Sequence, residues 1–315
     1  MRPTHPDRIA SRGVTLVELV VAIVLIGIIV ATTAYFLSPL TQSVDLTARA
    51  ELSDAADNAL QRMGREVRLA VPNSVRVATD GGNRRFLEFL PIRTAGRYRA
   101  EIGSVSSGTD CPANGGVTPP AADLLSFDAA ETCFKTIGGV VDIGTVTTND
   151  FLVFNNYGCP TPLTCFVGQN AYATAGTLNR VKITGVADEG ARARFSFAST
   201  TLDRSLHDST GKRFYVVIGN AATVLPEPVS YVCDSGAKTL VRRWGYTMTA
   251  AQPTAFTDGA VAPIAGNVVS CEFDYLPNVA PQIGLLTLRL TLSRAVSTGA
   301  ETVSLYHAVH VSNLP

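Results

Sequence analysis

Residues 12–31, RGVTLVELVVAIVLIGIIVA, decide how the rest of the chain is interpreted. They open an apolar run over residues 14–37 in which Glu18 is the one charged side chain. Roughly 20 apolar residues span a bilayer, whereas the apolar segment of a secretory signal peptide has about 7 to 15. The run therefore predicts a membrane-spanning helix that is not cleaved on its far side.

The charges on either side of this run predict its orientation. Arg2, Arg8 and Arg12 precede it, and Asp45 is the first charged residue after it. Because positive flanks stay in the cytoplasm, most of the chain is expected outside the cytoplasm.

The cysteines agree with an exported body, because all of them follow the apolar run. The even number of cysteines, six, favours disulfides in an oxidising compartment. A metal site is disfavoured because the sequence contains no CxxC pair. Fifteen pairings are possible; the sequential pairing closes the shortest loops and is the one we predict. It joins Cys111 to Cys133, Cys159 to Cys165, and Cys233 to Cys271.

Composition excludes one class of partner. The formal net charge is +0, and the sequence shows no basic stripe, so we expect no nucleic-acid binding. About 240 residues follow the apolar run, enough for one large domain or two small ones.

Glu18 is the unusual residue of the apolar run. A carboxylate inside a membrane helix costs about 2.5 to 3.5 kcal/mol on insertion scales, so it is a functional candidate by default. The alternative is that Glu18 lies near the cytoplasmic edge and extends to the lipid headgroups.

Residues 12–18, RGVTLVE, resemble the cleavage and methylation motif of type IV prepilins. In that family a glycine precedes an apolar first residue, most often phenylalanine, and a glutamate is fifth after the cut. The resemblance implies that prepilin peptidase cuts between Gly13 and Val14 and methylates the new amino group of Val14. Val14 stands where the family most often has phenylalanine. This departure affects the expected efficiency of cleavage and not the expectation of cleavage itself.

Cleavage would give Glu18 a partner. The freed amine of Val14 can pair with the Glu18 carboxylate of a neighbouring subunit inside an apolar bundle, where such a pair is strong and an unpaired partner is penalised.

A helix should continue beyond the membrane. Apolar residues in residues 43–70 recur near helical spacing, with charged residues largely between them. Pro39 and, to a lesser degree, Gly27 are expected to kink the helix, and Pro72 with Asn73 to end it. The apolar positions are Leu52, Ala56, Ala59, Met63 and Val67. An anchor followed by an unrelated helix is the alternative.

Beyond Pro72 the pattern changes to short β-rich runs. In residues 284–293, GLLTLRLTLS, polar and apolar side chains alternate, as expected for a strand with one buried face. Thr287, Arg289 and Thr291 alternate with Leu286, Leu288, Leu290 and Leu292. The fold class predicted is α+β, type IV pilin-like: a long helix packed on a mainly antiparallel sheet. Residues 103–125 are interpreted as a long surface loop fixed by Cys111.

No catalytic, cofactor or metal signature is found, and we expect none. The histidines are His5, His207, His307 and His310, and no GxSxG, HExxH or P-loop pattern occurs. His307 and His310 are three apart on an expected strand, so they should point to opposite faces and make poor co-ligands.

Further stretches are similar to the MshO-type minor pilins of the mannose-sensitive haemagglutinin (MSHA) pilus. These are residues 44–77, VSYVCD, RRWGY and the ending HAVHVSN. The resemblance implies a structural minor pilin that aids initiation of the pilus and surface attachment. A J-like pseudopilin of type II secretion is the second interpretation, and a membrane-anchored adhesin or enzyme is the third.

The resemblance also implies the organisation and the partners of the chain. Residues 1–13 would be the leader, 14–37 the membrane and assembly half of the helix, 38–71 its amphipathic half, and 72–315 a periplasmic head. The partners would be prepilin peptidase, other major and minor pilins, the assembly platform and, before assembly, the inner membrane. The final location would be the pilus at the cell surface.

Overall fold

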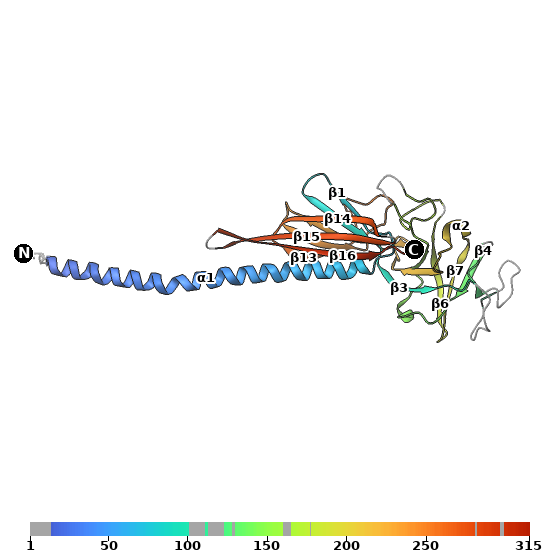
Figure 1. Cartoon of the computed structure of the whole chain (residues 1–315), viewed down its shortest axis with the longest axis horizontal. Coiled ribbons are helices and arrows are strands. Elements are labelled where there is room, and N and C mark those ends of the chain that lie inside the picture. Colours follow the sequence, from blue (N-terminus) through green and yellow to red (C-terminus); the bar gives the residue numbers. More distant parts are fainter. Residues whose placement is uncertain are drawn as a thin grey trace, which may run out of the picture. The chain divides into compact units, whose positions relative to one another are not determined.

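The computed structural model describes residues 14–100, 111–112, 123–127, 130–159, 165–176, 178–280, 282–296 and 299–315, without the side chains of 36–46, 278 and 280. Most of the loop expected over residues 103–125 lies outside these residues. Contacts divide the chain into two units, Met1–Glu51 with Arg294–Glu301, and Leu52–Ser293 with Thr302–Pro315. Figure 1 shows the elements in order along the chain.

Helix α1, Leu16–Arg68, is continuous from the apolar run into the amphipathic stretch. Its helical assignment passes through Gly27 and Pro39 without a break. The two segments considered in the sequence therefore form one element, as the pilin-like interpretation predicts. A bend at Gly27 or Pro39 stays a prediction.

The second half of α1 buries the face that its periodicity predicts. Leu52, Ala56, Ala59, Met63 and Val67 are each at most 4% exposed. Small side chains on this face allow close packing.

The helix ends at Arg68, earlier than the predicted stop at Pro72. The next residues leave the helix because their backbone pairs with residues 90–92, which follow strand β2 (Arg84–Phe89). Val71 N–H donates to Leu90 O (2.8 Å), and Ile92 N–H donates to Leu69 O (2.8 Å).

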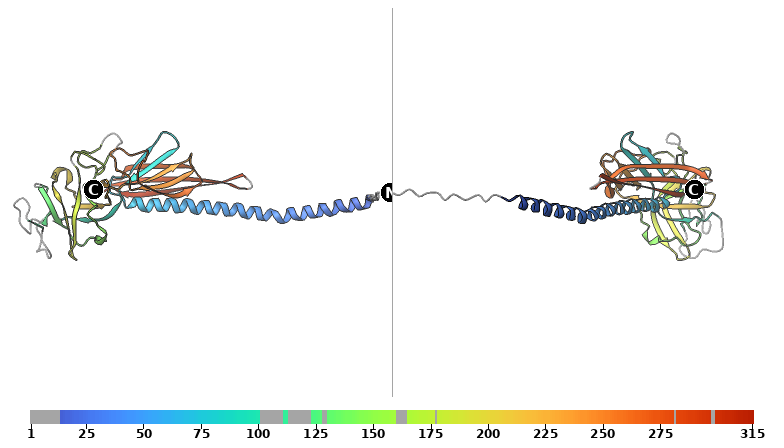
Figure 2. Two further views of the ribbon diagram at one scale, coloured as in Figure 1. Left: turned by 180° about the vertical axis from the view of Figure 1, so that it is seen from behind. Right: turned by 60° about the vertical axis from the view of Figure 1, so that its left-hand side comes forward.

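Two antiparallel sheets pack with the second half of α1. The first has the order β1-β2-β11-β12-β13 and the second β14-β15-β16. Their bounds are β1 Arg76–Thr79, β2 Arg84–Phe89, β11 Val229–Asp234, β12 Thr239–Trp244, β13 Ala260–Gly266, β14 Val268–Ala280, β15 Ile283–Val296 and β16 Gly299–Ser312. Both views of Figure 2 show the orange and red strands beside this part of the helix.

One hydrophobic core joins the helix to both sheets. The alternation predicted for β15 is confirmed, since the alternating residues Leu286, Leu288, Leu290 and Leu292 are buried. Gly64 permits the close approach of α1 to β16, because a Cβ there would lie 2.9 Å from His307 Nε2 and 3.2 Å from Val309 Cγ2. The Glu66 carboxylate ties the helix to β12 through Arg242 Nε at 2.8 Å.

A second core lies in the segment between β2 and β11. Its six strands have the order β3-β8-β5-β6-β7-β4. They are β3 Ile92–Arg97, β4 Ala130–Lys135, β5 Phe151–Phe154, β6 Arg180–Asp188, β7 Ala193–Thr201 and β8 Arg213–Val217, with short helices η2 Ile143–Thr145 and α2 Arg204–His207. A bridge between Tyr98 and Thr136 joins the ends of edge strands β3 and β4, so the sheet closes on itself.

Aromatic side chains fill this closed sheet. Phe134 lies within 6.2 Å, centroid to centroid, of Phe154, Phe195, Phe197 and Phe214. Edge-to-face and offset aromatic pairs of this kind contribute beyond the apolar area they bury. We call β3 to β8 the barrel.

A third, smaller core lies where the barrel meets the helix and sheets. It includes Val71, Leu90, Tyr172, Val217 and Met248. The two-residue strands β9 Gly219–Asn220 and β10 Leu225–Pro226 follow the barrel in the chain. The predicted α+β class, a long helix with mainly antiparallel sheets, is confirmed.

Candidate functional site

The apolar half of α1 is the first candidate site. Leu16–Tyr35 is 20 residues long with a mean hydropathy of 2.7, and none of it is buried within the protein. Leu16 is 80% exposed and Ile29 is 62% exposed. At about 25 cal/mol per Å² of apolar surface, leaving such a helix in water is very unfavourable, so it requires lipid or other apolar helices around it.

Glu18 lies in the first turn of this helix. Its backbone N–H donates to Thr15 Oγ1 at 3.3 Å, and Leu19 N–H donates to Thr15 O at 3.1 Å. Thr15 therefore caps the helix, and the free N–H groups of the first turn favour a carboxylate there. Sequence reasoning missed this role of Thr15, although the T-x-x-E spacing of a capping box was visible.

The residues of the predicted cut fall at the edge of the described chain. Gly13 lies outside the described residues, whereas Val14 is described and is 67% exposed just before the helix begins. Gly27 has open space where a side chain would be, with no atom within 4 Å of an ideal Cβ. The apolar surface around Gly27 is thus free to receive a neighbouring helix.

Each of the three disulfides joins two cysteines that are successive in the sequence. Cys233 on β11 is bonded to Cys271 on β14, so the bond links the two sheets that pack with α1. Cys159 is bonded to Cys165, and Cys111 to Cys133 on β4.

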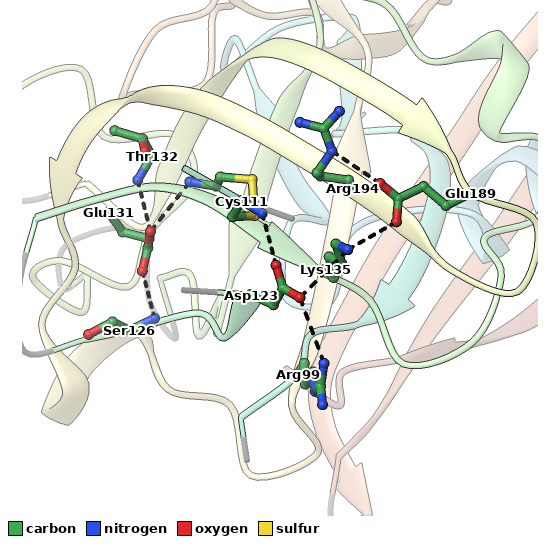
Figure 3. Close-up of a disulfide and its surroundings, with 10 residues drawn as sticks. Arg99, Cys111, Asp123, Ser126, Glu131, Thr132, Lys135, Glu189 and Arg194 are labelled. Atoms are coloured by element: carbon green, nitrogen blue, oxygen red, sulfur yellow. Dashed lines mark hydrogen bonds and ion pairs between the residues drawn. A yellow bond between two sulfur atoms is a disulfide. The ribbon is translucent and has the colours of Figure 1, made fainter. Parts of the chain in front are cut away.

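The Cys111–Cys133 disulfide is next to a cluster of buried charges, shown in Figure 3. Lys135 is fully buried and lies between two carboxylates, with Nζ 3.6 Å from Asp123 and 3.2 Å from Glu189. Arg99 lies 3.9 Å from Asp123, and Asp123 accepts from Cys111 N–H at 2.9 Å. Arg194 pairs with Glu189 at 3.2 Å.

This cluster fastens the segment around Cys111 and Asp123 to the barrel. Removing one member of a buried ion pair leaves an uncompensated charge, at a cost of about 3 to 5 kcal/mol. Lys135, Asp123 and Arg99 are buried, Glu189 and Arg194 lie at the edge of the cluster, and the charges face one another, so the arrangement is that of a structural clamp. Spacing could not reveal it, because the members come from four distant positions in the chain.

The histidines do not converge. On β16, His307 lies on the inward face next to Gly64, and His310 is exposed on the opposite face, as predicted. His207 is buried at the end of α2. His5 lies outside the described residues. Among the described residues, no group of three or more His, Cys, Asp or Glu side chains could hold a metal ion.

Comparison with known proteins identifies the amino-terminal segment. Residues 8–34 match the family described as the prokaryotic N-terminal methylation motif. No curated protein and no solved structure is significantly similar to the chain. The matched segment contains Gly13, Val14 and Glu18 and overlaps the exposed apolar helix, which supports a type IV prepilin-like protein.

Proposed function

We propose that this chain is a structural subunit of a type IV pilus, cut by prepilin peptidase between Gly13 and Val14 and methylated on Val14. The observation that carries the proposal is the coincidence of two features in one segment. The methylation motif covers residues 8–34, and Leu16–Tyr35 is an apolar helix without any protein covering it. A subunit that leaves the membrane to join a fibre needs such a helix.

The role proposed for Glu18 is assembly. After cleavage, the amine of Val14 is a cation at the start of an apolar helix, and the carboxylate of Glu18 is one turn away. Within one subunit the Glu18 backbone is engaged with Thr15. In a bundle of such helices, the carboxylate of one subunit pairs with the amine of the next, and the low dielectric makes the pair selective for one axial position.

The organisation proposed for the chain follows from this role. Residues 1–13 are the leader, 14–37 the membrane and assembly half, 38–71 the amphipathic half of the helix, and 72–315 the periplasmic head. The partners are prepilin peptidase, other major and minor pilins, and the assembly platform in the inner membrane. The disulfides of the head favour an oxidising compartment.

The finer assignment is a minor pilin of an MSHA-like pilus that aids initiation and surface attachment. It is supported by the stretches similar to MshO-type minor pilins, which in the structure lie on α1, β11, β12 and β16. The barrel adds bulk to the head, which is easier to accommodate at a fibre end than at every position of a fibre. A J-like pseudopilin would use the same helix for protein export.

The test replaces Glu18 with alanine in cells that lack the native protein. Because the substitution removes a charge from the membrane, we expect normal membrane levels and a normal head, but at least several-fold less protein in sheared fibres and fewer fibres. Glu51→Ala is the matched control: Glu51 lies on the same helix, is exposed, and pairs with Arg294 at 2.6 Å. Exposed pairs contribute little, so this variant should assemble normally.

The outcomes separate the interpretations. Normal incorporation and a normal fibre count for Glu18→Ala would contradict the assembly role. Loss of protein secretion with intact fibres would favour the pseudopilin. Activity of an uncut, unassembled protein would favour a membrane-anchored adhesin or enzyme.

A further inference from the structure

An open hollow of about 370 Å³ lies on the barrel, beside the C-terminal residues. Its walls are Ala95, Gly96 and Arg97 of β3, Arg213 and Tyr215 of β8, and Ser312 and Leu314 near the end of the chain. All of these residues belong to the same compact unit. The volume is within the range of about 300 to 1,000 Å³ that is usual for small-molecule sites.

Two arginines line this hollow from neighbouring strands. Strands β3 and β8 are antiparallel, and Arg97 is directly opposite Arg213 in their register. Like charges at opposed positions destabilise a sheet. The repulsion between Arg97 and Arg213 is therefore a cost to the stability of the sheet, and binding of an anion between them would offset it.

The guanidinium groups of both arginines come together at one glycine. Arg97 Nε donates to Gly211 O at 3.0 Å. A Cβ on Gly211 would lie 3.2 Å from Arg213 Cζ and 3.3 Å from its Nε and Nη1. The two cations are therefore gathered around the same turn, where a side chain larger than hydrogen would displace Arg213.

Neither Arg97 nor Arg213 forms an ion pair with another residue in the described part of the chain. Asp208, in the adjacent turn, is committed to other groups: it accepts from Lys212 Nζ at 2.7 and 2.8 Å and from Tyr98 OH at 2.5 Å. The side chains that line the hollow thus include two positive charges and no carboxylate.

The walls of the hollow are fixed. Tyr215 OH donates to Leu314 O at 2.8 Å, and Ser209 Oγ donates to Pro315 O at 2.9 Å, so the C-terminal residues are held against the barrel. Gly96 is packed against the barrel interior, since a Cβ there would lie 2.8 Å from Phe214 Cζ. A site with walls set in advance loses less free energy to ordering when a ligand binds.

We propose that this hollow binds a small carboxylate-bearing ligand, whose carboxylate accepts hydrogen bonds from Arg97 and Arg213. A guanidinium presents its donors in a planar fork that matches a carboxylate, and two of them exceed the charge of a single carboxylate. The volume suits one sugar acid or one small organic acid. The site is independent of pilus assembly, because it lies in the head and uses no part of the apolar helix.

The experiment measures binding by calorimetry to the full chain in detergent micelles, at low salt. The probes are sodium glucuronate, sodium succinate, inorganic phosphate and neutral glucose. Arg97→Gln and Arg213→Gln remove one charge each and should weaken carboxylate binding at least ten-fold. Arg289→Gln is the matched control, because Arg289 is an exposed strand arginine that pairs with Glu272 at 3.3 Å.

The probes distinguish the sources of the carboxylate. Glucuronate binding without succinate binding identifies a sugar acid, and the reverse identifies an organic acid; either result supports the site if both arginine variants lose it and Arg289→Gln keeps it. Binding by neither carboxylate, equal binding of glucose, preference for phosphate, or unchanged binding in the arginine variants would overturn the proposal.

Thermal unfolding distinguishes a variant that has lost the binding site from one that has failed to fold. A ligand that binds the folded state alone raises the melting temperature. The bound probe should raise it for the native chain and for Arg289→Gln but not for Arg97→Gln or Arg213→Gln, each of which must first show a cooperative transition in buffer.

Discussion

His207 is a buried histidine whose hydrogen bonds fix it in its neutral form. Asp203 N–H donates to its Nδ1 at 2.9 Å, so that nitrogen carries no proton, and Nε2 then donates to Gly168 O at 2.9 Å. Burial lowers the pKa of His207 below its usual value of 6.5, although Gly168 and Asp203 raise it in part. Protonation would also cost the bond from Asp203 N–H.

The lowered pKa of His207 predicts a pH dependence of stability. Between the folded and unfolded pKa values of His207 the unfolded chain binds more protons, so the stabilisation that His207 contributes is fully present above pH 6.5 and is lost on acidification. The melting temperature should therefore drop between pH 7.5 and pH 5.5. In His207→Gln the drop should be smaller, and in the control His310→Gln, where the histidine is exposed, it should equal that of the native chain. Equal drops in all three proteins would contradict this assignment.

At the scale of elements, the disulfide between β11 and β14 joins two sheets, whereas Cys159–Cys165 closes a short loop. The cysteines of these bonds are 38 and 6 residues apart in the sequence. Loop-closure entropy then assigns about 4 kcal/mol to the first and about 2 kcal/mol to the second.

We therefore expect Cys233→Ala with Cys271→Ala to lower the free energy of unfolding by about 2 to 5 kcal/mol. The matched double variant Cys159→Ala with Cys165→Ala should lose clearly less. Denaturant unfolding of the detergent-solubilised chain measures both. An equal loss, or recovery of Cys233 as a free thiol in unreduced peptide maps, would refute the role given to this bond.

Local patterns predicted most of the strands but not all of them. Alternation in residues 284–293 predicted β15 as a strand with one buried face. Strand β13, AVAPIAG, was missed because Pro263 interrupts its pattern; proline is tolerated because the strand is at a sheet edge and the register shifts between Leu240 and Val241. Strand β4 was missed because its short sequence, AETCFK, shows little alternation of apolar and polar residues.

Distant pairings were beyond sequence reasoning. Closure of the barrel depends on contacts such as Arg99 N–H to Lys135 O at 3.1 Å and Ile137 N–H to Arg97 O at 2.8 Å. The alternation of apolar and polar residues along a strand does not indicate which two edge strands will pair. The separate aromatic core of the barrel was for the same reason not predicted.

At the scale of the whole molecule, the two kinds of candidate site differ in how far sequence reveals them. Gly13, Val14 and Glu18 are close together in the chain, so their spacing alone carries the hypothesis. Arg97 and Arg213 are more than a hundred positions apart and become neighbours through the pairing of β3 with β8. The sequence could therefore indicate assembly, but not the charged hollow on the head.

If the chain is a processed prepilin-like subunit, its mature amino terminus differs from the encoded one. The protein should be purified from membranes of cells with an active prepilin peptidase, and its N-terminal peptide analysed by mass spectrometry. A bulky charged replacement, Gly13→Lys, should retain the leader and serves as the control. We expect the native protein to begin at Val14 and to carry one methyl group on its amino terminus; a native protein that still begins at Met1 would contradict the proposed processing.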